Sequence, residues 1–348
     1  MNVVAMISAM MLAQGNWNPD VRAELDTLIQ RNKGKDSAYA VFDFDNTVVI
    51  GDISNVCQWR QLETLAFKSD IEAALKSGIP ADYHDRVKRI ADLVKELQAI
   101  EEGERLRMPA WYRLAYEYWT LYGDLIAQCG TDVAYPWIGH LFAGYTSEDY
   151  QSFARLAARR QLSDGKGLWR DPDAPAQFPR GFAIAPESRE LFSALRKAGI
   201  SVYIVSASNW ELVQAMLSPE FGLQVDRDNV FAYRLAKDDN GRYLPQRDTN
   251  HLRPQAAGKV EIIRKHIAPR HGGSDPVLVA GDSMGDYNMF VEFPSLQAAL
   301  IYNRNPKNGP LADLIRSAPG SKAPRILVQG RDAAEGELIP SHDSPREP

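Results

Sequence analysis

The sequence predicts an α/β fold: a three-layer core on a parallel sheet, with a helical unit inserted into the chain. Two observations carry this prediction. Short apolar runs typical of buried strands alternate with helical patterns over residues 19–50 and again over 186–330, and such alternation is typical of parallel strands joined by right-handed crossovers. Over residues 51–177 the periodicity is helical and no clear strand pattern occurs, which indicates the inserted helical unit.

The first part of the core is predicted to be a helix followed by a strand. Asn18, Pro19 and Asp20 combine an N-cap residue, a proline at the first helical position and an acid in the first turn. Apolar residues follow at helical spacing, and Gly34 is expected to end the helix. The apolar run that begins near Ala38 then reads as a buried strand.

The second part of the core is predicted to contain one helix and several strands. The helix is expected over residues 186–199, and Asp239-Asn240-Gly241 is a strong signal for a hairpin turn. The expected strands cover residues 201–205, 230–235, 242–244, 276–280, 298–302 and 325–328.

These patterns divide the chain into three parts. Residues 1–52 and 178–330 are predicted to form a discontinuous core, and residues 53–177 a helical cap, with a linker rich in Pro, Gly and Asp over 164–180. The charged, Pro-rich residues 331–348 are predicted to be a disordered tail. Because the insertion follows the carboxyl end of the first strand, it is placed to act as a lid over that edge of the sheet.

Composition and charge exclude some classes of partner. The 348 residues carry a net charge of −5 and no long basic run, so nothing favours nucleic acid. No segment reaches the roughly 18 apolar residues of a membrane span. Residues 3–13 resemble the apolar core of a secretory signal, with Ala13 as its cleavage point, but a positively charged start is missing. Export to the periplasm and an ordinary N-terminal helix therefore both stay open, and the location stays unassigned.

The strongest functional signal is Asp43-Phe44-Asp45-Asn46-Thr47, directly after the first predicted strand. Ligands of open α/β sheets bind at the carboxyl edge of the strands. Two aspartates one residue apart can supply a nucleophile, a metal ligand and a general acid in one small site. The alternative is a turn whose aspartates cap the next helix, and this motif alone does not decide between the two.

Three further elements are predicted to end at the same edge. Ser206 and Ala207 lie between a strand and a helix, where a hydroxyl and free N–H groups can bind an anion, although an ordinary N-cap would look the same. Lys259 lies at a helix start, where a cation is unfavourable unless it faces anions; a solvated surface lysine is the alternative. Asp282 follows a strand and suits a metal ligand, and Asp286 can orient Lys259 or a metal-bound water.

With these four motifs in this order, the chain resembles the haloacid dehalogenase-like (HAD) hydrolase superfamily, which has a Rossmann-like core and a cap between the first two motifs. The resemblance implies that Asp43 is the nucleophile and forms an aspartyl-phosphate, and that Asp45 is the general acid and base. It also implies that Ser206, the Ala207 N–H and Lys259 bind the phosphoryl oxygens.

The same resemblance implies a Mg²⁺ cofactor. Its ligands would be Asp43, the carbonyl of Asp45 and Asp282, with Thr47 and Asp286 beside them. Because a phosphomonoester dianion repels a carboxylate nucleophile, the cation would offset that repulsion together with the lysine.

Within the superfamily, two groups are similar to this chain. Residues 38–47, 135–137 and 142–146 look like bacterial phosphorylcholine phosphatases, which are typically exported, and residues 281–286 look more like phosphoserine phosphatases. Residues 51–55 lack the paired glutamates expected of a quaternary ammonium site, while Asp52 lies where phosphoserine phosphatases carry a substrate-facing acid. The expected function is a Mg²⁺-dependent hydrolase of a small phosphomonoester, phosphorylcholine-like or phosphoserine-like.

Other functions of the same fold remain as alternatives. A phosphotransferase or mutase would need the same residues, and only product analysis separates it from a hydrolase. A dehalogenase would need neither Asp45 nor Mg²⁺, and a non-catalytic ligand-binding protein usually lacks a catalytic group, whereas none is missing here. The expected candidates for facing the substrate are Asp52, Trp59, Arg60 and the aromatic helix of residues 111–122.

Overall fold

The computed structural model describes residues 12–13, 15–163, 167–170, 179–322 and 324–347. The apolar run that resembles a secretory signal lies almost wholly outside these residues. Among the described helices, none combines the length and the apolarity needed to cross a membrane.

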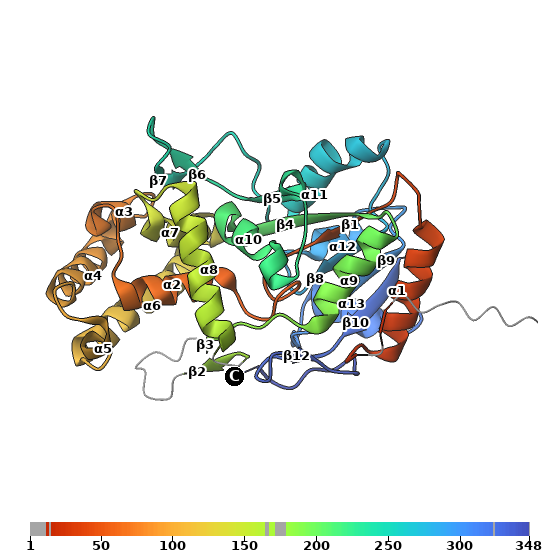
Figure 1. Cartoon of the computed structure of the whole chain (residues 1–348), viewed down its shortest axis with the longest axis horizontal. Coiled ribbons are helices and arrows are strands. Elements are labelled where there is room, and N and C mark those ends of the chain that lie inside the picture. The colour runs from red at the N-terminus through yellow and green to blue at the C-terminus, as the bar shows by residue number, and fades with distance from the viewer. Residues whose placement is uncertain (1–11, 14, 164–166, 171–178, 323, 348) are drawn as a thin grey trace, which may run out of the picture.

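A six-stranded parallel sheet forms the centre of the molecule, in the order β10-β9-β8-β1-β4-β5 (Figure 1). This order places β1 between β8 and β4, so the three strands that precede the predicted site motifs are neighbours. The strands are β1 (Tyr39–Phe42), β4 (Ser201–Asn209), β5 (Val230–Tyr233), β8 (Leu278–Gly281), β9 (Ala298–Tyr302) and β10 (Arg325–Gln329).

Both faces of the sheet are buried, which confirms the three-layer prediction. In β1, Ala40 and Phe42 belong to the hydrophobic cluster on one face, and Tyr39 and Val41 to the cluster on the other, as the alternation of side chains along a strand requires. The first face packs against α1 (Pro19–Asn32), α9 (Pro186–Lys197) and α10 (Trp210–Met216). The second packs against α11 (Ala257–Ile262), the π-helical turn η5 (Ile263–Ile267), α12 (Tyr287–Val291) and α13 (Pro310–Ser317). Short 3₁₀ turns complete the core: η3 (Pro219–Phe221), η4 (Arg227–Asn229) and η6 (Ala268–His271).

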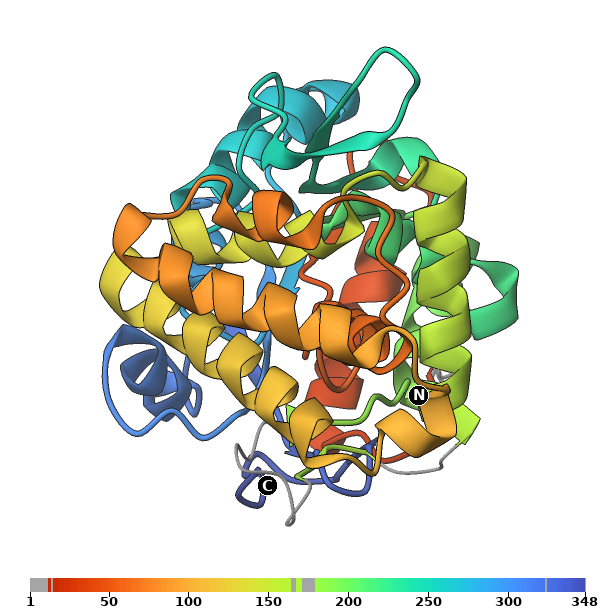
Figure 2. The ribbon, with the colours of Figure 1, turned by 90° about the vertical axis from the view of Figure 1, so that its left-hand side faces the viewer.

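The insertion after β1 is helical, and Figure 2 shows it as a layer of helices in front of the core. The aromatic side chains of α6 pack inside this layer: Trp111 and Trp119 lie 6.2 and 5.2 Å from Trp59, measured between ring centroids. Its elements are α2 (Ile53–Thr64), α3 (Ile71–Lys76), η1 (Ala81–Tyr83), α4 (His84–Leu97), α5 (Glu102–Arg105), α6 (Pro109–Cys129), α7 (Thr131–Gly139), η2 (His140–Phe142) and α8 (Ser147–Ser163). Two short antiparallel strands, β2 (Trp169–Arg170) and β3 (Pro179–Arg180), follow it.

The predicted strand over residues 230–235 is divided in the structure. β5 joins the central sheet beside β4, whereas β6 (Leu235–Lys237) pairs with β7 (Tyr243–Arg247) in an antiparallel hairpin across the predicted turn. The hairpin contacts the helical layer, where the Tyr243 N–H donates to the Tyr145 carbonyl at 2.9 Å and the Gly144 N–H donates to the Tyr243 carbonyl at 2.8 Å. Contacts distant in sequence therefore set this division.

Residues 331–347 differ from the predicted disordered tail. They contain the short antiparallel pair β11 (Arg331–Asp332) and β12 (Glu337–Leu338) and return to the core, where the Ser344 hydroxyl donates to the Asn303 carbonyl at 2.6 Å. Arg331 is 1% exposed and donates to the backbone carbonyl of Asn46 at 2.8 Å. The charged composition suggested disorder, but Arg331 pairs with Glu347, and Glu347 also pairs with Arg304 of the core.

His140, in η2, is a source of acid sensitivity. It is 3% exposed, and burial lowers its pKa to about 4. In the unfolded chain its pKa is about 6.5, so between about pH 6.5 and pH 4 the unfolded state takes up a proton more readily than the folded state. The free energy of unfolding therefore falls by about 3 kcal/mol over this window, and His140 changes it no further above or below. We expect His140→Gln to reduce the loss of unfolding free energy over this window, measured by urea unfolding at both pH values. The exposed His266→Gln is the control; equal losses in both variants would contradict the assignment.

Candidate active site

The loop after β1 carries the two predicted aspartates to the carboxyl edge of the sheet. The Asp43 N–H donates to the Ala280 carbonyl of β8 at 2.9 Å, which fixes the start of the loop. Asn46 has a positive φ of 57° and its side-chain oxygen accepts from the Gly51 N–H at 3.3 Å, so the loop turns back on itself. Asp43 therefore lies directly beside the end of β8.

Lys259, from α11, is buried between two acids. It is 2% exposed, and its Nζ lies 2.7 Å from Oδ1 of Asp43 and 2.7 Å from Oδ1 of Asp286. Burial by itself lowers the pKa of Lys259, but the charges of Asp286 and Asp43 outweigh it and raise that pKa above the usual range. The lysine thus stays charged although it is buried. A solvated surface lysine, the alternative prediction, would stay charged without such partners.

Asp286 is held by the turn that follows β8. Its Oδ2 accepts from the N–H groups of Asp282 and Ser283, both at 3.1 Å. Gly281 is required here, because a Cβ on it would lie 2.5 Å from the Cβ of Asp286. The absence of a side chain at Gly281 therefore leaves room for the side chain of Asp286 beneath the loop.

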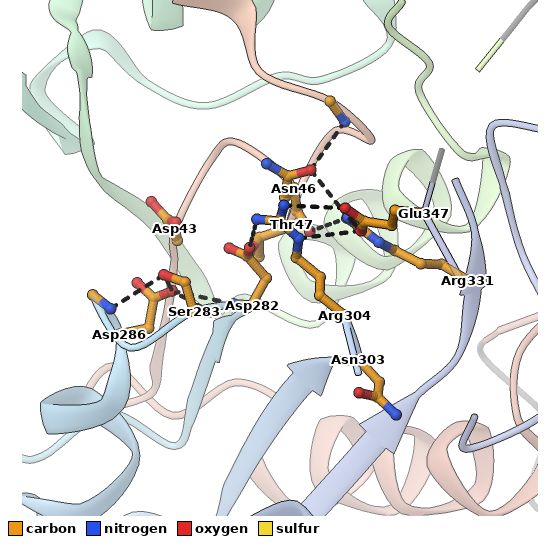
Figure 3. A network of polar contacts seen from close by, with 12 residues as sticks. Asp43, Asn46, Thr47, Asp282, Ser283, Asp286, Asn303, Arg304, Arg331 and Glu347 are labelled. Atoms are coloured by element: carbon orange, nitrogen blue, oxygen red, sulfur yellow. Dashed lines mark hydrogen bonds and ion pairs between the residues drawn. The ribbon is translucent and has the colours of Figure 1, made fainter. Parts of the chain in front are cut away.

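Asp282 has both carboxylate oxygens engaged. Oδ1 accepts from the Thr47 hydroxyl at 3.2 Å, and Oδ2 accepts from Nη1 of Arg304 at 3.0 Å. Figure 3 shows Asp282 and Asp286 at neighbouring positions, with Asp43 on the facing loop. Arg304 follows β9 and had no signal in the sequence that linked it to the four motifs.

Three carboxylates fit a divalent cation. Ligand oxygens of Asp43, Asp282 and Asp286 all lie within 4.8 Å of one another, and an all-oxygen, anionic donor set is the one that Mg²⁺ prefers. The expected set contained the backbone carbonyl of Asp45, which is not among these carboxylate ligands and stays a prediction. The Asp45 carboxylate accepts from the Ile53 N–H, at 2.7 Å, and from the Ser208 hydroxyl.

Crowding of these acids changes their protonation. Burial is the largest cause that raises the pKa of Asp43 to about 8, followed by the charge of Asp286, while Lys259 acts in the opposite direction. Desolvation, and next the charge of Asp52, raise the pKa of Asp45 well above its usual range. Asp45 can therefore carry a proton near neutral pH, and Asp43 needs additional positive charge to ionise there.

The end of β4 places its side chains differently from the prediction. Ser206 is 0% exposed, and its Oγ accepts from the Ser208 N–H at 3.1 Å. Ala207 and Ser208 line the cavity, and Ser206 is not among its lining residues. Ser208 is a site residue that sequence reasoning missed, although its place two residues beyond a predicted strand-end serine was a usable signal.

The cavity above these residues has a volume of about 540 Å³ and lies between the core and the helical layer. From the helical layer it is lined by residues of α6 and α7, among them Tyr122 and Tyr135, and Asp52 and Ser54 line it near the start of α2. The full lining is Asp43, Asp45, Asn46, Asp52, Ser54, Tyr122, Ile126, Thr131, Tyr135, Ile138, Ala207, Ser208, Gln255, Ala256, Lys259, Asp282, Ser283, Met284, Gly285 and Arg304.

Two predicted substrate-facing residues lie elsewhere. Trp59 is 5% exposed and packs against the tryptophans of α6, and Arg60 pairs with Glu102 at 2.7 Å. Of the predicted aromatic helix, Tyr122 lines the cavity, while Trp111 and Trp119 do not. Helical spacing identified a buried face but could not tell which of its residues reach the cavity.

Comparisons with known proteins show what the chain is similar to. The model of the haloacid dehalogenase-like hydrolases matches residues 138–290. Phosphorylcholine phosphatase of Pseudomonas aeruginosa is 25% identical over 272 residues, which are 75% of this chain and 62% of that protein, so the chain spans less than two thirds of this relative's length.

Solved structures show the fold. A conserved protein of unknown function from Anaerococcus prevotii has a TM-score of 0.84 and 23% identity, covering 97% of this chain and 98% of that one. A substrate-bound phosphoserine phosphatase has a TM-score of 0.41 and 15% identity, covering 89% of this chain and 95% of that one, which is too distant to carry an argument.

Proposed function

We propose that this chain is a haloacid dehalogenase-like hydrolase, a phosphatase that cleaves a small phosphomonoester through an aspartyl-phosphate on Asp43, with Mg²⁺ as its cofactor. One observation carries the proposal: Lys259 Nζ lies 2.7 Å from both Asp43 and Asp286, within a cavity that also holds Asp45 and Asp282. One cavity, large enough for a small ester, thus holds the proposed nucleophile Asp43, the proposed acid Asp45 and the ammonium of Lys259. Carboxylates proposed to bind Mg²⁺ lie beside them.

In the proposed reaction, an Asp43 carboxylate oxygen attacks the phosphorus and the ester oxygen leaves. Asp45 gives its proton to that leaving oxygen, which yields the alcohol and an aspartyl-phosphate. Asp45, now a carboxylate, then takes a proton from the water that attacks the phosphorus and releases inorganic phosphate and Asp43. Its raised pKa supports the first of these two roles.

Positive charge is needed because a carboxylate attacks a dianion. Lys259 supplies a fixed charge at the nucleophile, and its second bond to Asp286 holds the ammonium in place. When bound, Mg²⁺ would be held by Asp43 and Asp282, with Asp286 beside them, and would neutralise charge on the nucleophile and the phosphoryl oxygens.

The cavity wall supports a substrate with a cationic group. Asp52 lines the cavity beside Tyr122 and Tyr135, and after burial its charge is the next cause that raises the pKa of both tyrosines. An acid next to aromatic rings suits an ammonium group. This wall fits phosphorylcholine-like and phosphoserine-like esters, and the Pseudomonas aeruginosa relative is itself a phosphorylcholine phosphatase.

Asp52→Asn tests this wall without removing the helix cap. Asp52 Oδ1 accepts from the Asn55 N–H at 3.1 Å at the start of α2, and asparagine caps helices as well as aspartate does. We expect KM for phosphoethanolamine to rise about tenfold, as the loss of one ion pair implies, and kcat/KM for an uncharged ester such as glycerol phosphate to change less than about twofold. Rates are compared at the pH optimum of each variant, because Asp52 also raises the pKa of Asp45. Equal changes for both esters would contradict the role of Asp52.

A direct test of the function is phosphate release from a panel of esters with Mg²⁺. The panel includes phosphorylcholine, phosphoethanolamine and phosphoserine, each assayed with and without an added alcohol as acceptor. Release of inorganic phosphate in water is the expected result. Transfer to the alcohol with little free phosphate would identify a phosphotransferase instead, and no turnover at high enzyme concentration would overturn the proposal.

A further inference from the structure

Arg304 is a second cation at the site that the proposed reaction does not use, and its side chain is 37% exposed. It lines the cavity, and its Nη1 donates to Oδ2 of Asp282 at 3.0 Å. Its Nε and Nη2 donate to the two carboxylate oxygens of Glu347, each at 3.1 Å. The guanidinium therefore joins an acid of the proposed cation site to an acid of residues 331–347 (Figure 3).

Arg304 competes with a cation for the carboxylate of Asp282. The Asp282 side chain is 3% exposed, and its oxygens accept from Thr47 and Arg304. A carboxylate that is already neutralised by a guanidinium binds a second cation less strongly, because the positive charges repel each other in a poorly solvated site. A cation that uses Asp282 must displace Arg304 or bind next to its charge.

On the other side, Glu347 is a fixed partner. Arg331 is 1% exposed, donates to the carbonyl and to the side-chain oxygen of Asn46 at 2.8 and 3.0 Å, and forms an ion pair with Glu347. This buried arginine holds Glu347 over Arg304. Glu347 can therefore keep a two-point contact with Arg304 whether or not Arg304 also contacts Asp282.

We propose that Arg304 weakens cation binding at Asp282, and that Glu347 reduces this effect by binding the Arg304 guanidinium. When a cation enters, Arg304 gives up Asp282 and keeps Glu347. This inference rests on the proposed Mg²⁺ site. It makes Arg304 and Glu347 residues that set the affinity of the site for Mg²⁺, acting through Asp282.

The test is the Kd for Mg²⁺, measured by calorimetry on the full chain after chelation and dialysis. Arg304→Met is expected to lower Kd at least about fivefold, because a competing charge is lost. Glu347→Gln is expected to raise Kd at least about fivefold, because Arg304 then turns to Asp282. The double variant should match Arg304→Met within about twofold, since Glu347 acts through Arg304. Arg316→Met, at an exposed ion pair with Asp313, is the matched control and should not change Kd.

The opposite signs separate this proposal from a structural role, because damage to the fold would weaken Mg²⁺ binding in both variants. Thermal unfolding in chelator shows which variants are folded, and Arg304→Gln replaces Arg304→Met should the latter unfold. An unchanged or raised Kd in the folded Arg304 variant, or additive effects in the double variant, would overturn the inference while the proposed function stands. A wild-type chain that binds no Mg²⁺ would overturn the proposed cation site, and this inference with it.

Discussion

Asp43→Asn is expected to lower kcat at least about 10³-fold, because the substitution removes the nucleophile and keeps the shape of the side chain. The variant should remain folded. Lys259 keeps its 2.7 Å contact with Asp286, and the repulsion among the three neighbouring acids falls. The measurement is the initial rate of phosphate release at saturating ester and Mg²⁺, with the thermal unfolding midpoint as the check on folding.

The matched control is Asp313→Asn, which removes an exposed carboxylate far from the motifs in sequence. It should keep the wild-type rate. Retention of more than a few per cent of that rate by Asp43→Asn, with deamidation excluded by mass spectrometry, would falsify the nucleophile assignment.

Removal of divalent cations is expected to lower turnover at least about 10³-fold, and Mg²⁺ should restore it. The physical reason lies in the pKa of Asp43, which burial and the neighbouring acids raise to about 8 in the absence of a cation. At pH 7 the nucleophile is then mostly protonated. The measurement is phosphate release in EDTA, followed by back-titration with Mg²⁺.

The same pKa predicts a proton release on cation binding. Below pH 8 the metal-free Asp43 holds a proton that a bound cation must displace, so Mg²⁺ binding at pH 7 should release close to one proton, and the release should vanish well above pH 8. Calorimetry in two buffers of different ionisation enthalpy measures this proton release.

In the chelation experiment, equal rates in EDTA and in Mg²⁺ would contradict the role of the cation.

Much of the core was predictable because local sequence and fold agree there. The runs before Asp43 and Asp282 are apolar on both faces and end in polar residues, which is what a buried parallel strand requires. Since parallel strands present their carboxyl ends at one edge, Asp43 and Asp282, 239 positions apart in the sequence, could be assigned to one site from the sequence alone. The structure brings Asp43, Lys259, Asp282 and Asp286 together there.

The remaining features depend on contacts that no local pattern encodes. Arg304 and Arg331 lie outside the four motifs, and their roles follow from the partner that each finds across the fold, Asp282 and Asn46 respectively. Residues 331–347 contact the core through Arg331 and Glu347, whose partners Asn46 and Arg304 lie outside that segment, so composition alone predicted disorder. Likewise, helical spacing identified the buried aromatic face of α6 but not that Tyr122 is the aromatic that reaches the cavity.

In the proposed reaction, Asp43 carries the phosphoryl group during turnover. The most direct measurement is to quench the enzyme during steady-state hydrolysis, reduce it with borohydride, and map the product by peptide mass spectrometry, since an acyl phosphate on aspartate is reduced to homoserine. We expect homoserine at position 43, dependent on both ester and Mg²⁺ and absent from Asp43→Asn. Modification of Asp45 or of any other residue in place of Asp43, in enzyme that is turning over, would contradict it.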